Sequence, residues 1–224
     1  MARTTADFLE RARIVLLRPQ HPGNVGAAAR AMMTMGLTQL VLVQPPNMSS
    51  ERAREQARAQ ATHAGPLLEQ MRICDTLEDA VAGCGWVVGA SARPRHLGDE
   101  PLSPWAMAQQ ALALPPAQPL ALLFGPERTG LTNEELDRCH AIVRIPADPR
   151  YSSLNLAQAV QVLAYELRRA ALPEAPRVAR KQDHPWYAPP RAEEVERFYG
   201  HLEKVLLATG FLDPQNPRAL MRRL

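Results

Sequence analysis

The chain has 224 residues, of which 46% are hydrophobic, and carries 26 Lys and Arg against 23 Asp and Glu. This length suits one large domain, with or without a short appendage, and the composition excludes a disordered or collagen-like chain. No run approaches about 18 apolar residues, and residues 1–13 lack the order of a secretory signal, so we expect a soluble, cytoplasmic protein. Cys74, Cys84 and Cys139 are far apart and form no CxxC pair, which favours reduced core thiols over disulfides or a zinc site.

Charge is distributed unevenly along the chain. Residues 1–60 carry 8 basic and 4 acidic side chains, residues 61–167 carry 7 and 12, and residues 168–224 carry 11 and 7. Both ends are therefore basic, and the middle is acidic. All but two of the basic residues are arginines, whose forked side chain matches a phosphate with two hydrogen bonds. A genome that favours Arg codons explains this composition at least as well as a nucleic-acid partner, so charge supports only a hypothesis of polyanion binding.

Short apolar runs alternate with helical patterns up to about residue 170. Such runs predict strands buried on both faces, and the segments between them have helical spacing or begin with a helix-start residue. In chain order we expect strand 13–17, helix 24–35, strand 39–43, helix 50–61, strand 72–74, helix 77–82, strand 86–90, helix 104–112, strand 120–125, helix 133–138, strand 141–145 and helix 154–171. This alternation predicts an α/β domain with a mainly parallel sheet.

The composition changes after Leu172. Residues 172–191 hold five prolines among charged residues, which predicts a linker or an extended surface arm. A helix is predicted over 192–209, closed by Gly210, and a shorter helical piece over 217–224. We therefore divide the chain into an α/β domain at 1–171, a proline-rich linker at 172–191 and a helical extension at 192–224.

The loops that follow strands are the candidate sites, because ligands of open α/β sheets bind beyond the carboxyl ends of the strands. Four of these loops are unusual: PQHPGNVGAAAR at 19–30, ASARPR at 90–95, FGPERTGL at 124–131 and IPADPRYSSLN at 145–155.

In the first loop, Gly23 and Gly26 permit a close backbone approach, and Asn24 can cap the following helix. The loop has neither the third glycine of GxGxxG nor the ending of a Walker loop. Its spacing alone favours a capped surface helix packed on the sheet.

The other three loops leave a structural and a ligand-binding interpretation open. Arg93 and Arg95 could hold a phosphate, or their loop could be a plain polar turn. The third loop is a rigid Gly-Pro turn with Glu127 close to its backbone amides. In the fourth, Ser152 or Ser153 is a candidate N-cap for the long helix, which is compatible with a ligand at the same place. The six histidines show no metal-ligand spacing, so we expect no metal site.

Three segments together carry a family resemblance. NVGAAARAM at 24–32, LLFGPERTGLTNEEL at 122–136 and IPADPRYSSLNLAQAVQVLAYE at 145–166 resemble, in order and spacing, the signature motifs of the SpoU branch of the SPOUT RNA methyltransferases. VVGASARPR at 87–95 and the GHLEKVLLATGF segment at 200–211 extend the resemblance over nearly the whole chain. It implies an S-adenosylmethionine-dependent enzyme that methylates a ribose 2′-hydroxyl in tRNA, with cytidine or uridine at nucleotide 32 as the expected target. A SpoU-type enzyme for rRNA or another tRNA position is the alternative, and a non-catalytic RNA-binding protein of this fold is the alternative from another class.

The resemblance also implies the parts of the site. The α/β domain would contain a C-terminal trefoil knot, and the enzyme would be a homodimer with shared active sites. S-adenosylhomocysteine would be the product, and neither a metal nor a membrane is implied. The residues assigned to catalysis are Arg30, Glu127, Ser153 and Asn155. Those assigned to the cofactor are Ala90, Ser91, Ala92, Gly125, Ile145, Ser152, Ser153 and Leu154. Those associated with RNA are Asn24, Arg95 and Tyr151.

The chemistry of methyl transfer limits what these residues must do. A sulfonium methyl group is already activated, so the protein mainly aligns the ribose hydroxyl and helps its proton to leave. A guanidinium has five N–H donors and no acceptor, so Arg30 is a poor proton acceptor. We therefore expect Arg30, supplied by the partner subunit, to hold the target phosphate and stabilise the developing alkoxide, and Glu127 to orient it across the dimer.

Overall fold

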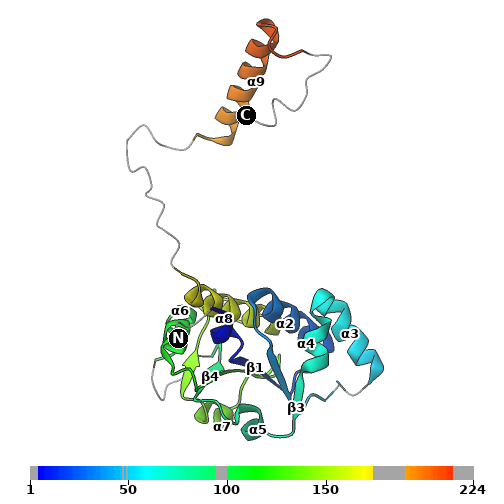
Figure 1. The fold of residues 1–224 in the computed structure, drawn as a ribbon, viewed down its shortest axis with the longest axis vertical. Coiled ribbons are helices and arrows are strands. Elements are labelled where there is room, and N and C mark those ends of the chain that lie inside the picture. The colour runs from blue at the N-terminus through cyan, green and yellow to red at the C-terminus, as the bar shows by residue number, and fades with distance from the viewer. Residues whose placement is uncertain (1–4, 47, 49, 94–99, 174–189, 214–224) are drawn as a thin grey trace. The chain divides into compact units, whose positions relative to one another are not determined.

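The structure, a computed structural model, describes residues 5–46, 48, 50–93, 100–173 and 190–213. The chain divides into two compact units, Met1–Glu174 and Ala175–Leu224 (Figure 1). Most of the predicted linker and the predicted helical piece at 217–224 lie outside the described residues, so both stay predictions. Within the described ranges, no helix combines the length and the hydropathy needed to span a membrane.

The first unit is built on a parallel six-stranded sheet of order β3-β2-β1-β5-β4-β6. Its strands are β1 (Ala12–Leu17), β2 (Gln39–Val43), β3 (Arg72–Cys74), β4 (Trp86–Ala90), β5 (Leu120–Phe124) and β6 (Ala141–Val143). In the centre of the sheet, Ile14 of β1 pairs with Leu40 of β2 and with Leu122 of β5. The predicted α/β class and its parallel sheet are confirmed.

Helices cover both faces of this sheet (Figure 1). One layer contains α1 (Thr5–Leu9), α2 (Pro22–Met35), α3 (Glu51–Ala61), the 3-10 turn η1 (Thr62–Ala64), α4 (Gly65–Gln70), α6 (Pro104–Ala113) and α8 (Leu156–Ala171). The other contains α5 (Leu77–Val81) and α7 (Asn133–Asp137). The sequence pattern missed α1 and α4, because helices of five and six residues are too short to show a helical period.

Two hydrophobic cores lie on opposite sides of the sheet. Side chains alternate along a strand, so β1 places Ile14 and Leu16 in the larger core and Val15 and Leu17 in the smaller one. Burial on both faces explains why the strands read as unbroken apolar runs. In the larger core, Leu163 and neighbouring residues of α8 at helical spacing are completely buried, as predicted.

The expected helix caps are wrong at both α2 and α8. Pro22 occupies the first turn of α2, where its fixed φ suits a helix start, so the helix begins earlier than predicted and Asn24 lies inside it. The long helix α8 is capped by Asn155, and not by Ser152 or Ser153. The Asn155 side chain accepts a hydrogen bond from the backbone N–H of Ala157 at 2.9 Å. The two serines are thereby free of the capping role and line a cavity instead.

The cysteines form no disulfide. Cys74 is buried, and Cys84 and Cys139 are partly buried against the smaller core. Burial raises the pKa of the Cys84 thiol, an effect that the charges of Arg13 and Arg72 oppose. All three side chains pack against the smaller core, and Cys74 is the most buried of them. Their reduced state stays a prediction.

The second unit contains the helix α9 (Ala192–Ala208), which ends before a left-handed Gly210 with φ of 68°. Both the helix and its closing glycine agree with the prediction. None of the helix's side chains is buried, and the rings of Phe198 and Tyr199 meet edge to face at 5.7 Å.

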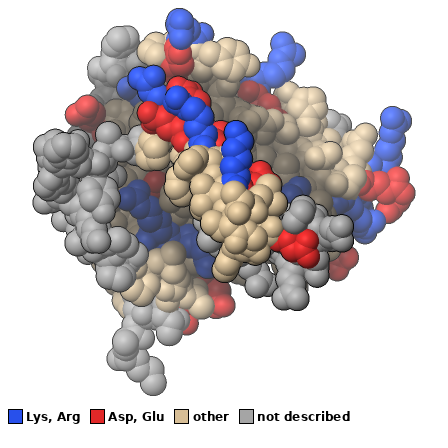
Figure 2. All heavy atoms as spheres, turned by 90° about the horizontal axis from the view of Figure 1, so that it is seen from above, with Lys and Arg blue, Asp and Glu red and all other residues tan. Residues whose placement is uncertain are grey.

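Acidic and basic side chains are interspersed over the face of the molecule drawn in Figure 2. The described residues seen there form no broad surface of one sign.

Candidate active site

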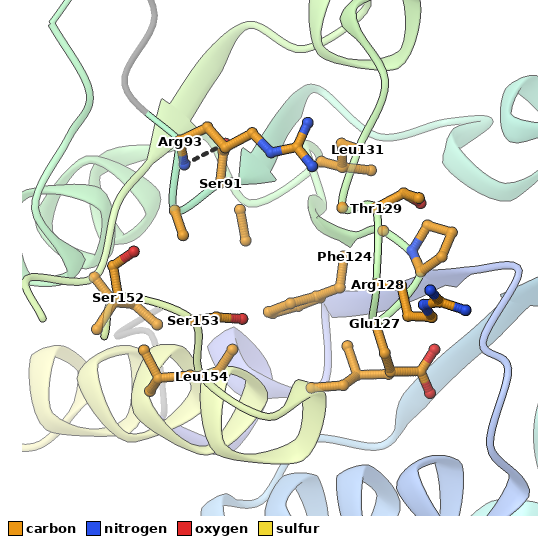
Figure 3. Close-up of a pocket in the computed structure, with 18 of the residues that line it drawn as sticks. Ser91, Arg93, Phe124, Glu127, Arg128, Thr129, Leu131, Ser152, Ser153 and Leu154 are labelled. Atoms are coloured by element: carbon orange, nitrogen blue, oxygen red, sulfur yellow. Dashed lines mark hydrogen bonds between the residues drawn. The ribbon is translucent and has the colours of Figure 1, made fainter. Parts of the chain in front are cut away.

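A cavity of about 400 Å³ lies beyond the carboxyl ends of β4, β5 and β6 (Figure 3). Three of the four candidate loops line it, from residues 90–93, 124–131 and 145–154. The structure therefore brings together loops that are far apart in the sequence, at the edge where ligands of such sheets bind. The lining includes all the residues predicted to hold a cofactor: Ala90, Ser91, Ala92, Gly125, Ile145, Ser152, Ser153 and Leu154.

Glycine is required at the start of the loop after β5, residues 124–131, which is the middle one of the three loops that line the cavity. A Cβ atom on Gly125 would lie 2.2 Å from the carbonyl carbon of Gly130 and 2.3 Å from the backbone nitrogen of Leu131. Gly130 itself has a φ of +66°, in the left-handed region. The loop thus folds back on its own backbone at Gly125, and in this conformation it forms one wall of the cavity.

The neighbouring loop is tied to β6. The backbone N–H of Ser91 donates to the carbonyl of Val143 at 3.1 Å. The Ser91 hydroxyl accepts a bond from the backbone N–H of Arg93 at 3.3 Å (Figure 3). These bonds orient the small residues after β4 toward the cavity.

Glu127 joins three segments at the edge of the cavity. One carboxylate oxygen, Oε2, accepts a hydrogen bond from the backbone N–H of Gln20 at 2.9 Å. The other, Oε1, accepts from the backbone N–H of His21 at 3.2 Å and from Nδ2 of Asn24 at 2.9 Å. Oδ1 of Asn24 in turn accepts from Nδ2 of Asn155 at 3.0 Å. Asn24, Glu127 and Asn155 therefore form one hydrogen-bonded chain that links α2, the loop after β5 and the start of α8.

These bonds also set the charge of Glu127. Burial pushes its pKa upward, but the bonds from Asn24, Gln20 and His21, and one from its own backbone, outweigh burial and lower the pKa below its usual value. Glu127 is therefore ionised at neutral pH. Its negative charge lies at the N-terminus of α2, where the helix dipole favours an anion.

The other predicted residues lie outside the cavity lining. Arg30 is on the exposed face of α2, and its side chain makes no hydrogen bond or ion pair with the part of the chain that the structure describes. Tyr151 is 82% exposed and directly precedes the two cavity serines. Arg95 lies outside the described residues.

Several residues of this region were given no role in the sequence analysis, although most of them lie in the candidate loops at 19–30 and 124–131. Leu131 and Thr129 complete the middle loop's wall, and the backbone N–H groups of Gln20 and His21 anchor Glu127. Arg18, which follows β1 with a φ of 44°, pairs with Glu135 at 2.5 Å. No local sequence signal identifies these partners, because each bond joins segments more than 100 positions apart.

Comparisons with known proteins give a consistent set of relatives. The model of the SpoU rRNA Methylase family matches residues 11–165, and that of the tRNA methyltransferase TrmJ C-terminal domain matches residues 193–224. The tRNA (cytidine/uridine-2'-O-)-methyltransferase TrmJ of Klebsiella pneumoniae is 47% identical over 217 residues, which cover 97% of this chain and 87% of that protein.

Solved structures agree with these sequence matches. The crystal structure of TrmJ from Z. mobilis superposes with a TM-score of 0.66 at 33% identity, covering 95% of this chain and 87% of the other. An AdoMet-bound rRNA methyltransferase from Sinorhizobium meliloti has a TM-score of 0.57 at 25% identity, covering 77% and 62%.

Proposed function

The chain belongs to the SpoU methylase family, and we propose that it uses S-adenosylmethionine to methylate the ribose 2′-hydroxyl of nucleotide 32, cytidine or uridine, in tRNA. It is a tRNA methyltransferase, like the TrmJ relative that is 47% identical to it. The observation that supports the use of S-adenosylmethionine is the cavity, whose lining contains every residue expected to hold the methyl donor. The cytidine/uridine specificity of the curated relative supports the choice of base.

The cavity suits S-adenosylmethionine in size and in chemistry. Its volume of about 400 Å³ lies within the range of small-molecule sites, which is about 300–1,000 Å³. Leu131, Ile145 and Leu154 offer apolar contacts to a flat ring, and the hydroxyls of Ser152 and Ser153 offer hydrogen bonds to polar groups. The bound cofactor supplies an activated methyl group, so these residues need only bind and orient it. The trefoil knot that the family resemblance implies stays a prediction.

The reaction also requires a side chain that binds the RNA at the target nucleotide, and we assign this role to Arg30 of a second copy of the chain. Arg30 is exposed and outside its own chain's cavity, which suits a side chain that completes another subunit's site. A guanidinium offers five N–H donors and no acceptor, so it binds the target phosphate and stabilises the oxyanion that forms as the hydroxyl attacks. The proton leaves to that phosphate or to water.

Glu127 is suited to orient Arg30 across this dimer. The bonds from Gln20, His21, Asn24 and its own backbone hold the Glu127 carboxylate in one orientation and keep it ionised. Its negative charge attracts a guanidinium from a partner subunit. Asn155 and Asn24 then act as positioning residues, because they hold Glu127 and the start of α8 in place.

The proposal is tested with unmodified tRNA and methyl-labelled S-adenosylmethionine, followed by mapping of the labelled nucleotide. Label on the ribose of nucleotide 32 is the expected result. Label at another tRNA position, or on rRNA alone, contradicts the proposed target, and binding without transfer contradicts the enzymatic function itself.

A variant of Arg30 tests its role in the same assay. Arg30→Lys keeps the charge but loses the forked donor geometry, so we expect a large loss of rate with unchanged cofactor binding. Arg58→Lys serves as the control, because Arg58 is an exposed residue of α3 whose ion pair with Glu51 a lysine can keep. An Arg30→Lys enzyme that methylates tRNA at the unaltered rate would show that the assigned role is wrong.

A further inference from the structure

A second hollow, of about 420 Å³, lies beside the active-site cavity. Its described lining residues come from the turn after β1, the start of α2, the segment between β2 and α3, and the first two turns of α3: Gln20, His21, Pro22, Pro46, Ser50, Arg52, Ala53 and Gln56. The turn at Gln20 and His21 is common to both sites, because its backbone N–H groups donate to Glu127, which lines the active-site cavity. The backbone turn at Gln20 and His21 thus separates the second hollow from the edge of the active-site cavity, where we expect the ribose.

The packing of α3 on α2 is close and leaves little rotational freedom. Ala53, Ala57 and Ala61, at a spacing of four residues, form the buried stripe of α3. A Cβ atom on Gly26 of α2 would lie 1.9 Å from the carbonyl oxygen of Ala57, so the two helices touch through backbone at this point. This contact fixes which residues of α3 lie on each flank of the stripe.

The two flanks of α3 have different surroundings. Arg52 and Gln56, one turn apart, line the hollow beside the active site. Arg54 and Arg58, also one turn apart, line a separate cavity of about 340 Å³ in which Met48, Leu68 and Met71 supply apolar walls. Arg52 and Arg54 therefore lie on opposite flanks of α3. Of the two, only Arg52 lies next to the active site.

The hollow offers hydrogen-bond donors and, among its described lining residues, no carboxylate. Arg52 contributes a guanidinium that makes no ion pair with any residue the structure describes. Gln56 contributes an amide, and the Ser50 hydroxyl, which accepts a bond from the backbone N–H of Ala53 at 3.2 Å, keeps its own proton for a further acceptor. Such a set binds an anion with acceptor oxygens, and a phosphodiester is the matching group in an RNA substrate.

We propose that this hollow binds a backbone phosphate of the RNA strand next to the methylated nucleotide, with Arg52 as its principal contact. The inference rests on the proposed function, because it takes the ribose in the neighbouring cavity as the reference point. Phosphate contacts fix the register of a nucleic acid on a protein without reading its bases. Arg52 is therefore a positioning residue that helps to determine which ribose reaches the methyl donor.

The test compares Arg52→Ala with Arg54→Ala, which removes the same charge from the other flank of the same helix. The dissociation constant of unmodified tRNA is measured for both variants and the parent protein over a series of salt concentrations. Loss of one phosphate contact lowers the salt slope by about 0.7–0.9 and weakens binding about 5–10-fold at ~0.1 M salt. We expect this change for Arg52→Ala and not for Arg54→Ala, with partial recovery in Arg52→Lys.

Cofactor binding and thermal melting of each variant separate this effect from misfolding, and both should match the parent protein. Equal tRNA affinities for Arg52→Ala and Arg54→Ala, whether both reduced or both unchanged, would overturn the phosphate site. If the parent protein binds tRNA but methylates none, the proposed function fails, while a selective loss in Arg52→Ala would still support the phosphate site.

Discussion

Replacing Glu127 by Gln tests the hydrogen-bonded chain at the edge of the active site. The substituted amide keeps the shape of the carboxylate, and its oxygen can still accept the bonds from His21 and Asn24. Its NH₂ group then takes the place of Oε2 and faces the backbone N–H of Gln20, which donates to Oε2 at 2.9 Å in the parent protein. One charge-assisted bond is lost and two donors face each other, which costs about 1–3 kcal/mol in free energy of unfolding.

Thermal unfolding measures this cost. In a domain of this size about 1 kcal/mol shifts the melting temperature by ~2–4 °C, so we expect Glu127→Gln to melt about 2–12 °C lower at pH 7. Glu134→Gln is the matched control, since Glu134 is an exposed carboxylate of the adjacent α7. The variant should also methylate tRNA more slowly, because the start of α2 and the cavity loop are no longer held together.

The pH dependence of the difference in stability between the parent protein and Glu127→Gln provides an independent check. Because the folded pKa of Glu127 is lowered, its carboxylate stabilises the protein above the unfolded value of about 4.3. This stabilisation is lost as the pH falls through the folded pKa. The gap in stability between the parent protein and Glu127→Gln should therefore narrow on acidification below about pH 4. If Glu127→Gln melts at the same temperature as Glu134→Gln at pH 7, or if its stability difference from the parent protein does not change with pH, the stabilising role of the Glu127 carboxylate is refuted.

Three further substitutions test other parts of the account. Gly125→Ala should weaken binding of S-adenosylmethionine by at least about tenfold in calorimetry, a loss of ~1.4 kcal/mol. The reason is that the new Cβ collides with the backbone of residues 130–131. The control variant Gly65→Ala, which has no atom within 4 Å of the new Cβ, should bind the cofactor normally. Asn155→Ala should cost about 0.5–2 kcal/mol in denaturant unfolding through loss of the α8 cap, and it should slow methylation because the bond to Asn24 is lost as well. Leu163→Ala should cost about 2–5 kcal/mol of stability by leaving a cavity in the larger core, and equal stability to the parent protein would contradict the packing described for α8.

The central strands of the sheet were predictable because residues buried on both faces of a strand appear in the sequence as an unbroken apolar run. Residues Leu120–Phe124 are all buried, and they read as an unbroken apolar run. The starts of helices were less predictable, because several residues near each start can cap. Asn24 resembles a cap in the sequence, yet Pro22 begins α2 before it, and the Asn24 side chain is bound to Glu127 and Asn155.

The positions of the cavity loops followed from the rule for parallel sheets, but the bonds between loops did not. Asn24 contacts Glu127 across 103 positions of the sequence and Asn155 across 131 positions. No periodicity or local motif reports such a pairing, which depends on the order of strands in the sheet. The phosphate-binding hollow was likewise invisible, because the sequence does not show which arginine of α3 lies on which side of its alanine stripe.

The central claim is that two copies of this chain share each methylation site, and subunit complementation tests it most directly. Arg30→Ala removes the contributed guanidinium, and Gly125→Val blocks the cofactor cavity, so each variant alone should be inactive. If Arg30 acts in the partner subunit's cavity, a mixed dimer contains one site with both an intact cavity and an intact Arg30. Co-purified mixed dimers are therefore expected to methylate tRNA although neither homodimer does. Mixed dimers that form, bind S-adenosylmethionine and still transfer no methyl group would contradict the shared site.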